Sequence, residues 1–200
     1  MQLIETIRAE KGEFLNLNFH QNRMNNSRME LFNCTDKIDL KSILQNRSSE
    51  ISTNQLYKCR IIYDTDIKNV EFVPYQLPDI NFLKLVKCDE IEYSHKYYNR
   101  QQINVLFEQK GTADDIIIVK NGLITDSSFS NLLFYNGKQW LTPAFPLLKG
   151  TQRAFLLKQE IILTADIRLD DLLHFIKIRL INAMIKFEDE VDVEIENIIN

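Results

Sequence analysis

Glycine is scarce in this chain, with only five glycines among 200 residues. The sequence has no GxGxxG fingerprint, Walker loop, GxSxG elbow or HExxH pair, so nothing in it supports dinucleotide, P-loop, hydrolase or zinc-protease chemistry. The three cysteines are scattered and lack CxxC spacing, which favours idle or buried thiols in a reducing compartment. The three histidines also lack metal-ligand spacing, and we expect no metal site.

An excess of positive charge is absent too. The formal net charge is -4 and the two signs are interspersed, so we expect neither nucleic acid nor an anionic membrane as a partner. No apolar run approaches the roughly 20 residues of a membrane helix. The first residues, MQLIETIRAEKGEF, carry early charges instead of an apolar signal core. These features predict a soluble, cytoplasmic protein.

The composition that remains is globular, with 44% hydrophobic and 26% charged residues. It allows one large domain or two small ones around a shared cleft. The stretch PYQLPDI, which holds Pro74 and Pro78, shows no helical or strand pattern. We therefore predict a boundary near residue 80, with α+β domains over residues 1–80 and 81–200.

Hydrophobic periodicity predicts the elements of the first half. Two strands are expected over 2–8 and 14–19, around the turn at Lys11 and Gly12. A helix should run from His20 to about Asn33, and a short one over 39–46. An exposed loop over 45–54 and strands over 57–63 and 69–75 complete this half.

The second half is predicted to begin with a strand over 82–88 and a helix over 97–109. Asn121-Gly122 and Asn136-Gly137 are tight-turn dipeptides between apolar runs. They predict an antiparallel meander in place of βαβ units. A further helix should follow Gly150, with short elements after it.

Four separated segments stand out as candidates for chemistry. Taken singly, each has an ordinary structural explanation: Lys96 or Arg23 as a surface charge, Asp126 as a turn residue, Gly150-Thr151 as a loop and helix cap. In this order and spacing they resemble the class IV aminotransferase family of pyridoxal-phosphate (PLP) enzymes. The segments are HQNRMNNS at 20–27, HKYYNR at 95–100, ITDSSFSN at 124–131 and KGTQR at 149–153.

The resemblance spans nearly the whole chain. It implies a two-domain, D-amino-acid aminotransferase-like α+β fold with a cofactor cleft between the domains, a homodimer, and PLP as cofactor. Lys96 matches the Schiff-base lysine, and Tyr93 and Tyr98 are candidate substrate contacts. The implied cofactor-binding residues are Arg23, Lys96, Asp126, Ser130, Gly150, Thr151, Gln152, Asn182 and Ala183.

The chemistry of PLP explains why these residue types would be needed. One lysine amine forms an imine with the aldehyde, and exchange with a substrate amine frees that lysine to move protons. A carboxylate facing the ring nitrogen keeps it protonated. Asp126 stands where the family has a glutamate, so its side chain is one methylene shorter. The phosphate would meet Arg23 and the amides of the helix that follows Gly150.

Two reactions share this core, and both act on a small-molecule amine. The segment KYYNR and the segment INAMI at 181–185 resemble the family's aminodeoxychorismate lyases. Such a lyase converts 4-amino-4-deoxychorismate to 4-aminobenzoate and pyruvate, in the folate pathway. One alternative is an aminotransferase for branched-chain or D-amino acids. A second is a non-catalytic family member, which the aspartate and the short connection between the halves suggest.

Overall fold

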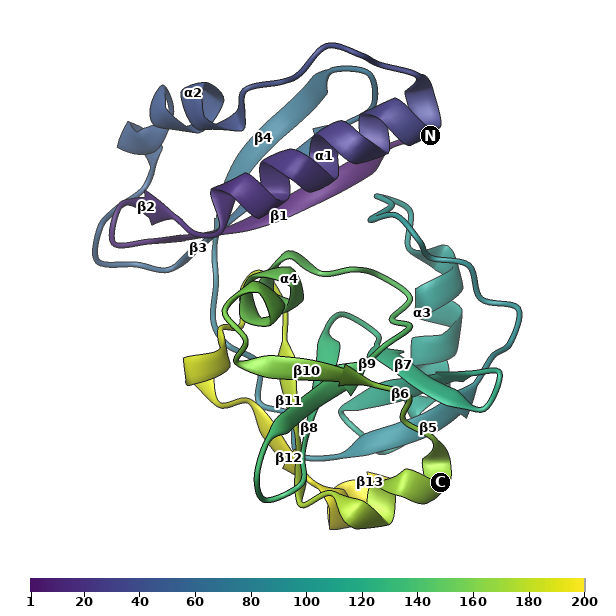
Figure 1. The fold of residues 1–200 in the computed structure, drawn as a ribbon. Coiled ribbons are helices and arrows are strands. Elements are labelled where there is room, and N and C mark those ends of the chain that lie inside the picture. The colour runs from purple at the N-terminus through teal and green to yellow at the C-terminus, as the bar shows by residue number, and fades with distance from the viewer. Residues whose placement is uncertain (200) are drawn as a thin grey trace. The chain divides into compact units, whose positions relative to one another are not determined.

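A computed structural model describes residues 1–199, and the chain divides into two compact units (Figure 1). The first unit comprises Met1–Leu77 and His95–Asn99, and the second comprises Pro78–Ser94 and the chain from Arg100 onward. The predicted boundary near residue 80 lies close to the point between Leu77 and Pro78 where the chain first passes from one unit to the other. The prediction put Lys96 in the C-terminal half, however, whereas its segment packs with the first unit.

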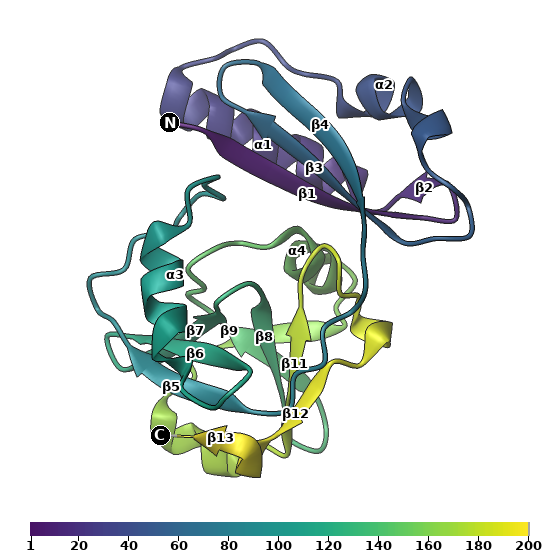
Figure 2. The same ribbon diagram turned by 180° about the vertical axis from the view of Figure 1, so that it is seen from behind.

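The first unit is an antiparallel sheet covered on one face by a helix. Figures 1 and 2 show α1 along one face of the strands, seen from opposite sides. The strand order is β2-β1-β3-β4. The elements are β1 (Leu3–Glu10), β2 (Glu13–Phe14), α1 (Leu17–Phe32), α2 (Leu40–Gln45), η1 (Ser48–Glu50), β3 (Tyr57–Tyr63) and β4 (Ile67–Pro74).

The core of this unit forms where the strand and helix periodicities meet. Leu3 and Ile7 of β1 pack with Met24 of α1 and with Leu40 and Leu44 of α2. The predicted strand over 14–19 is wrong beyond Phe14. Asn16 adopts a left-handed backbone with φ 55°, and α1 begins at Leu17. Leu17 then packs on the core from the helix, so burial overrides the alternating pattern.

The second unit is built on a nine-stranded sheet with the strand order β10-β9-β8-β7-β6-β5-β13; β11 pairs with β8 and β12. Its helices are α3 (Gln101–Phe107), η2 (Glu108–Lys110), α4 (Thr151–Lys158), η3 (Leu169–His174), η4 (Phe187–Asp189) and η5 (Ile195–Asn197). Its strands are β5 (Leu83–Lys87), β6 (Asp115–Lys120), β7 (Leu123–Ser127), β8 (Asn131–Tyr135), β9 (Trp140–Pro143), β10 (Ile162–Ala165), β11 (Lys177–Ile181), β12 (Asp192–Glu194) and β13 (Ile198–Ile199).

Both Asn-Gly turns are confirmed as hairpin connections. Asn121 and Gly122 have φ of 52° and 76°, the left-handed values that a two-residue turn between β6 and β7 requires. The predicted antiparallel meander is confirmed from β6 to β9, where each strand pairs antiparallel with the next. The meander is flanked by parallel pairs, which the sequence analysis did not predict. β5 and β6 pair in parallel around α3, and β9 and β10 pair in parallel around α4. Because parallel neighbours need a crossover, the two short helices supply it.

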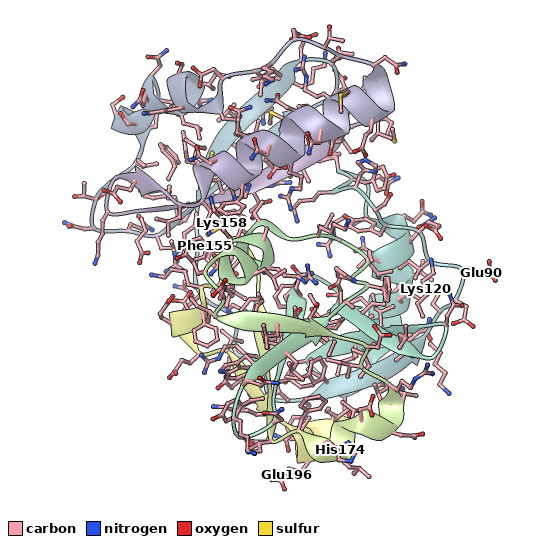
Figure 3. All side chains as sticks on the ribbon, viewed as in Figure 1. Glu90, Lys120, Phe155, Lys158, His174 and Glu196 are labelled. Carbon is pink, nitrogen blue, oxygen red and sulfur yellow. The ribbon has the colours of Figure 1, made fainter. Side chains whose placement is uncertain are left out.

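Helix α4 packs on one face of this sheet. Its Leu156 joins a cluster with Leu133, Ile162 and Ile181. Figure 3 shows Phe155 and Lys158 farther along the same helix. Asn131, like Leu133, is on β8, and β7 pairs with β8 through Asp126 and Asn131. Since residues two apart on a strand share a face, this pairing brings Asp126 to the α4 side.

Within residues 1–199, no helix is both long enough and apolar enough to cross a membrane.

Candidate active site

Lys96 is held by backbone pairing to the edge of β1. Ile4 N–H donates to the Lys96 carbonyl at 3.0 Å, and Tyr98 N–H donates to the Gln2 carbonyl at 3.0 Å. Leu3 and Tyr97 form an antiparallel bridge between these two bonds. The predicted helix over 97–109 is therefore wrong at its start, and α3 begins only at Gln101. Edge pairing, which depends on a strand far away in the sequence, fixes the lysine backbone.

A fully buried carboxylate, Glu5, lies on β1 next to this pairing. His20 Nδ1 is 2.6 Å from its Oε2, and Arg23 reaches both oxygens, with Nε to Oε1 at 2.8 Å and Nη2 to Oε2 at 2.5 Å. His20 and Arg23 are three residues apart on α1 and so share a face. The HxxR segment thus forms a charge cluster on Glu5, a residue that the sequence analysis did not single out.

Electrostatics within this cluster decide its protonation. Burial favours a raised pKa for Glu5, but the Arg23 charge and the hydrogen bonds from His20 and Arg23 outweigh it and lower the pKa to about 2. Burial lowers the pKa of His20; its bond to Glu5 opposes this, while the charges of Arg23 and Lys96 add to it. Near pH 7 a neutral His20 therefore donates its Nδ1 proton to ionised Glu5.

Arg23 was predicted to bind phosphate with a bidentate contact. In the structure, its Nε–Nη2 edge is bound to Glu5. A phosphate contact would therefore use the other edge of the guanidinium group. By fixing the orientation of the guanidinium group, Glu5 supports the predicted phosphate-binding role of Arg23.

Asp126, in the second unit, is buried at the end of β7 and held at both oxygens. Asn131 Nδ2 donates to Oδ1 at 2.7 Å, and the Leu148 amide donates to Oδ2 at 2.9 Å. Burial raises the pKa of Asp126 to about 6, although both hydrogen bonds and the Arg153 charge pull it down. A carboxyl group that titrates near neutral pH is suited to share or stabilise a proton on a nitrogen base.

The N-terminus of α4 is tied to this acid through Leu148, whose amide donates to Asp126 and which lies two residues before Gly150. Gly150 is the N-cap and offers no side chain, while Thr151 and Gln152 are buried in the first turn. Arg153 anchors the helix to β9 through the Thr142 hydroxyl at 3.2 Å and the Pro143 carbonyl at 2.9 Å. The first-turn amides and the helix dipole make this end suitable for an anionic group.

Ser130 and Asn182 shape the turn that follows Asp126. The Ser130 hydroxyl lies 2.9 Å from that of Ser127, which also accepts the Ser130 amide at 3.0 Å. Asn182 Nδ2 donates to the Phe129 carbonyl at 3.3 Å, and its Oδ1 accepts two amides of its own turn. These contacts give both side chains supporting roles. Ala183 follows Asn182 in the same turn, and its cofactor-binding role stays a prediction.

The two tyrosines proposed as substrate contacts belong to different units. Tyr93 lines a cavity of about 390 Å³ in the second unit, together with Lys120, Thr125 and Phe145. Tyr98 is in the first unit and is 46% exposed. The structure does not group them within one unit, and their roles stay predictions.

Asp115, at the start of β6, is a buried carboxyl group without a hydrogen-bond partner in the described chain. Burial raises its pKa, and the nearby Ser127 and Ser128 hydroxyls, outside hydrogen-bonding geometry, lower it only part-way. An acid whose pKa rises on folding binds more protons in the folded state, so it costs stability as pH rises above 3.8. At pH 7.5 we expect Asp115→Asn to raise the free energy of unfolding by about 1–3 kcal/mol in urea titrations.

Asp114 supplies the matched control for this change. Its carboxylate accepts the amides of Asn81 and Phe82 at 2.8 and 2.9 Å, which lower its pKa. Asp114→Asn should therefore destabilise the protein at the same pH. Equal signs for the two neighbouring substitutions would contradict the buried, unpartnered state of Asp115.

Comparison with known proteins gives the family. A family model described as amino-transferase class IV matches residues 94–187. A protein of Haemophilus influenzae, described only as uncharacterized, is 41% identical over 190 residues, covering 91% of this chain and 97% of its own. The solved structure of a proposed 4-amino-4-deoxychorismate lyase from Haemophilus somnus is 38% identical with a TM-score of 0.89, covering 93% of this chain and 97% of that one.

The chain belongs to the class IV aminotransferase family. This family typically binds PLP. A hypothetical aminotransferase of Mycobacterium tuberculosis, solved with PLP bound, shares the fold at 15% identity and a TM-score of 0.76, covering 98% of this chain and 81% of that one. The predicted family and the predicted D-amino-acid aminotransferase-like α+β fold are confirmed, and the structure builds this fold, known as fold IV, with two sheets.

Proposed function

We propose that this protein is a PLP-dependent lyase that converts 4-amino-4-deoxychorismate to 4-aminobenzoate and pyruvate. The observation that carries the proposal is its likeness, over nearly all of both chains, to the Haemophilus somnus protein of that proposed activity. The KYYNR and INAMI segments support the same reaction. As part of this proposal, the protein works as a homodimer.

The residues present suit PLP by the chemistry of their donors. Lys96 is fixed at the β1 edge, and its charge acts on His20 of the Glu5 cluster. In the second unit, Asp126 offers a buried carboxyl group of raised pKa for a ring nitrogen. Gly150, Thr151 and Gln152 open α4 with amides suited to a phosphate. When bound, PLP supplies an aldehyde that captures the substrate amine and a ring that withdraws electrons.

In this proposal each chain residue has a definite task. Lys96 would hold the cofactor, and its side-chain amine is the base that would take the proton from the amine-bearing carbon of the substrate. Asp126 would help keep the cofactor ring nitrogen protonated. In the first unit Arg23, oriented by Glu5, is a candidate phosphate contact, and in the second unit the amides of α4 are another. The C–O bond to the enolpyruvyl group breaks as the ring becomes aromatic, and the proton held by Lys96 would pass to the enolpyruvyl methylene carbon to give pyruvate.

The test combines a product assay with labelling of the lysine. The protein supplied with PLP should form pyruvate and 4-aminobenzoate in equal amounts from 4-amino-4-deoxychorismate. Borohydride reduction should place the cofactor on Lys96, as read by peptide mass spectrometry. Lys96→Ala should lose the label and about 10²–10⁴-fold in rate, whereas Lys87→Ala, at an exposed lysine on β5, should keep both.

Two outcomes would overturn the proposal. Conversion of PLP to pyridoxamine phosphate by amino acids, without pyruvate from 4-amino-4-deoxychorismate, would identify an aminotransferase. A protein that takes up no PLP would favour the non-catalytic alternative. The substitution of aspartate for the family's glutamate at position 126 is the feature that motivates that alternative.

A further inference from the structure

The side-chain amide of Asn131, the first residue of β8, links the buried acid Asp126 to the start of α4. We propose that Asn131 is a positioning residue whose single amide sets the spacing between the ring-facing carboxyl group and the phosphate-facing end of α4. The inference rests on the proposed use of PLP and adds a residue that holds both ends of the cofactor site in the second unit.

The hydrogen bonds of Asn131 form a closed arrangement. Its Nδ2 donates to Asp126 Oδ1 at 2.7 Å and to the Leu148 carbonyl at 2.8 Å. The Leu148 amide donates to Asp126 Oδ2 at 2.9 Å. Both partners of Nδ2 are acceptors, so the chemistry fixes which end of the amide faces them. Asp126 and the peptide of Leu148 therefore cannot shift independently while Asn131 is present.

The other end of the amide lies against Gly150. A Cβ atom at position 150 would lie 2.0 Å from Asn131 Oδ1 and 3.2 Å from its Cγ. Gly150 has φ -66° and ψ 149°, an extended backbone open to any residue. Its conformation therefore does not demand glycine, whereas the close approach of Asn131 does. The same side chain that holds Asp126 thus fixes where α4 begins.

This arrangement matters because PLP is a rigid ring with a short phosphate tail. The acid at one end and the amides at the other must match its length, and a misplacement of about 1 Å can cost on the order of 10²-fold in rate. An aspartate reaches less far than a glutamate, so its position depends more on what holds it. The Asn131 side-chain amide and the Leu148 backbone amide each donate to one of its oxygens, and the Arg153 charge acts on it.

The experiment uses Asn131→Ala, Asn131→Asp and a control. Asn131→Asp keeps the shape of the side chain but replaces the donor with an acceptor next to Asp126, which keeps the test valid should the alanine variant fold poorly. Asn136→Ala is the matched control, because Asn136 also bonds backbone amides, at 3.0 Å, but in the exposed β8–β9 hairpin. Urea unfolding of every variant measures how far the substitution changes the free energy of unfolding, separately from its effect on Asp126 and on PLP binding.

The first readout needs no cofactor. Carbon-13 NMR of the aspartate carboxyl groups, assigned with Asp126→Asn, gives the titration of Asp126 in each variant. Loss of the Asn131 donor should move that titration upward by about one pH unit in Asn131→Ala, and further in Asn131→Asp because a second carboxyl group is added. Asn136→Ala should leave the titration unchanged.

The second readout uses PLP and pyridoxal, which lacks the phosphate. Asn131→Ala should weaken PLP binding about tenfold or more and shift the pH midpoint of the visible band, while pyridoxal binding falls less. Lower stability with an unchanged Asp126 titration and unchanged PLP binding would overturn the inference. Failure of the unmodified protein to take up PLP would instead defeat the proposed function, and the NMR titration would still decide whether Asn131 holds the acid.

Discussion

Replacing Gly150 with alanine should destabilise the protein by about 1–3 kcal/mol and weaken PLP binding, although the backbone there accepts any residue. The new methyl group would lie 2.0 Å from Asn131 Oδ1, far inside van der Waals contact. Relief requires a shift of Asn131, which holds Asp126, or of the start of α4. Urea unfolding and a PLP titration followed in the visible range measure the two effects.

A double-mutant cycle isolates the cause. In an Asn131→Ala background the clash is gone, so Gly150→Ala should cost less than about 0.5 kcal/mol beyond Asn131→Ala, the small penalty of alanine at an N-cap. Gly122→Ala is a useful contrast, since Gly122 has φ 76° and nothing within 4 Å of a Cβ. Its cost should come from backbone strain and be unaffected by Asn131. An equal penalty for Gly150→Ala in both backgrounds would contradict the clash.

Replacing Glu5 with glutamine should have the largest effect on the stability of the first unit. The carboxylate is fully buried and shared by Arg23 and His20, so its loss breaks the Arg23–Glu5 ion pair and the His20–Glu5 hydrogen bond. Breaking a buried pair in this way typically costs about 3–5 kcal/mol. Urea unfolding at pH 7 measures it, with the m-value used to check that both proteins unfold in one step.

Glu71→Gln is the matched control, because Glu71 pairs with Arg60 on the same sheet but both side chains are over one-third exposed. That change should cost less than about 1 kcal/mol. A penalty at Glu5 no larger than the one at Glu71 would mean that the buried cluster contributes little.

The Glu5 contribution also has a characteristic pH window. Its pKa falls from 4.5 to about 2 on folding, so the stabilisation is complete above 4.5 and is lost as pH falls towards 2. At about 1.4 kcal/mol for each tenfold change in proton affinity, this amounts to about 3 kcal/mol. The stability difference between wild type and Glu5→Gln should therefore shrink between pH 4.5 and 2. A difference that stays constant over this range would rule out an ionised Glu5.

Local signals predicted much of this fold. The Asn-Gly dipeptides identified two hairpins. Asn121 and Gly122 both adopt the positive φ of a two-residue turn, whereas in the connection over 136–139 only Gly137 does, and Gly150 marked the start of α4. The elements whose bounds the sequence predicted wrongly depend on partners far away in the chain. Lys96 and Tyr97 pair with β1, and Leu17 joins a core built from four other elements, so neither position could be read from neighbouring residues.

The candidate site divides in the same way. The ordered segments identified Lys96, Arg23, Asp126 and Gly150 as residue types suited to one chemistry. Glu5 was not identified, although a glutamate within the apolar alternation of strand 3–10 was a signal that something buried must neutralise it. The part played by Asn131 depends on how closely its Oδ1 lies to Gly150, where an added Cβ would be only 2.0 Å away, and no spacing along the chain reveals this.

The pairing of His95–Asn99 with β1 has a consequence for how relatives can exchange parts. Lys96 is encoded within the stretch that otherwise builds the second unit, yet its backbone is aligned by Gln2 and Ile4 of the first. A recombination breakpoint near residue 77 would join a lysine segment from one parent to a β1 edge from another. A gene fragment ending there would leave that edge without its partner and open to other chains. The two units are thus compact in space but interleaved in the gene, and they are expected to be inherited together.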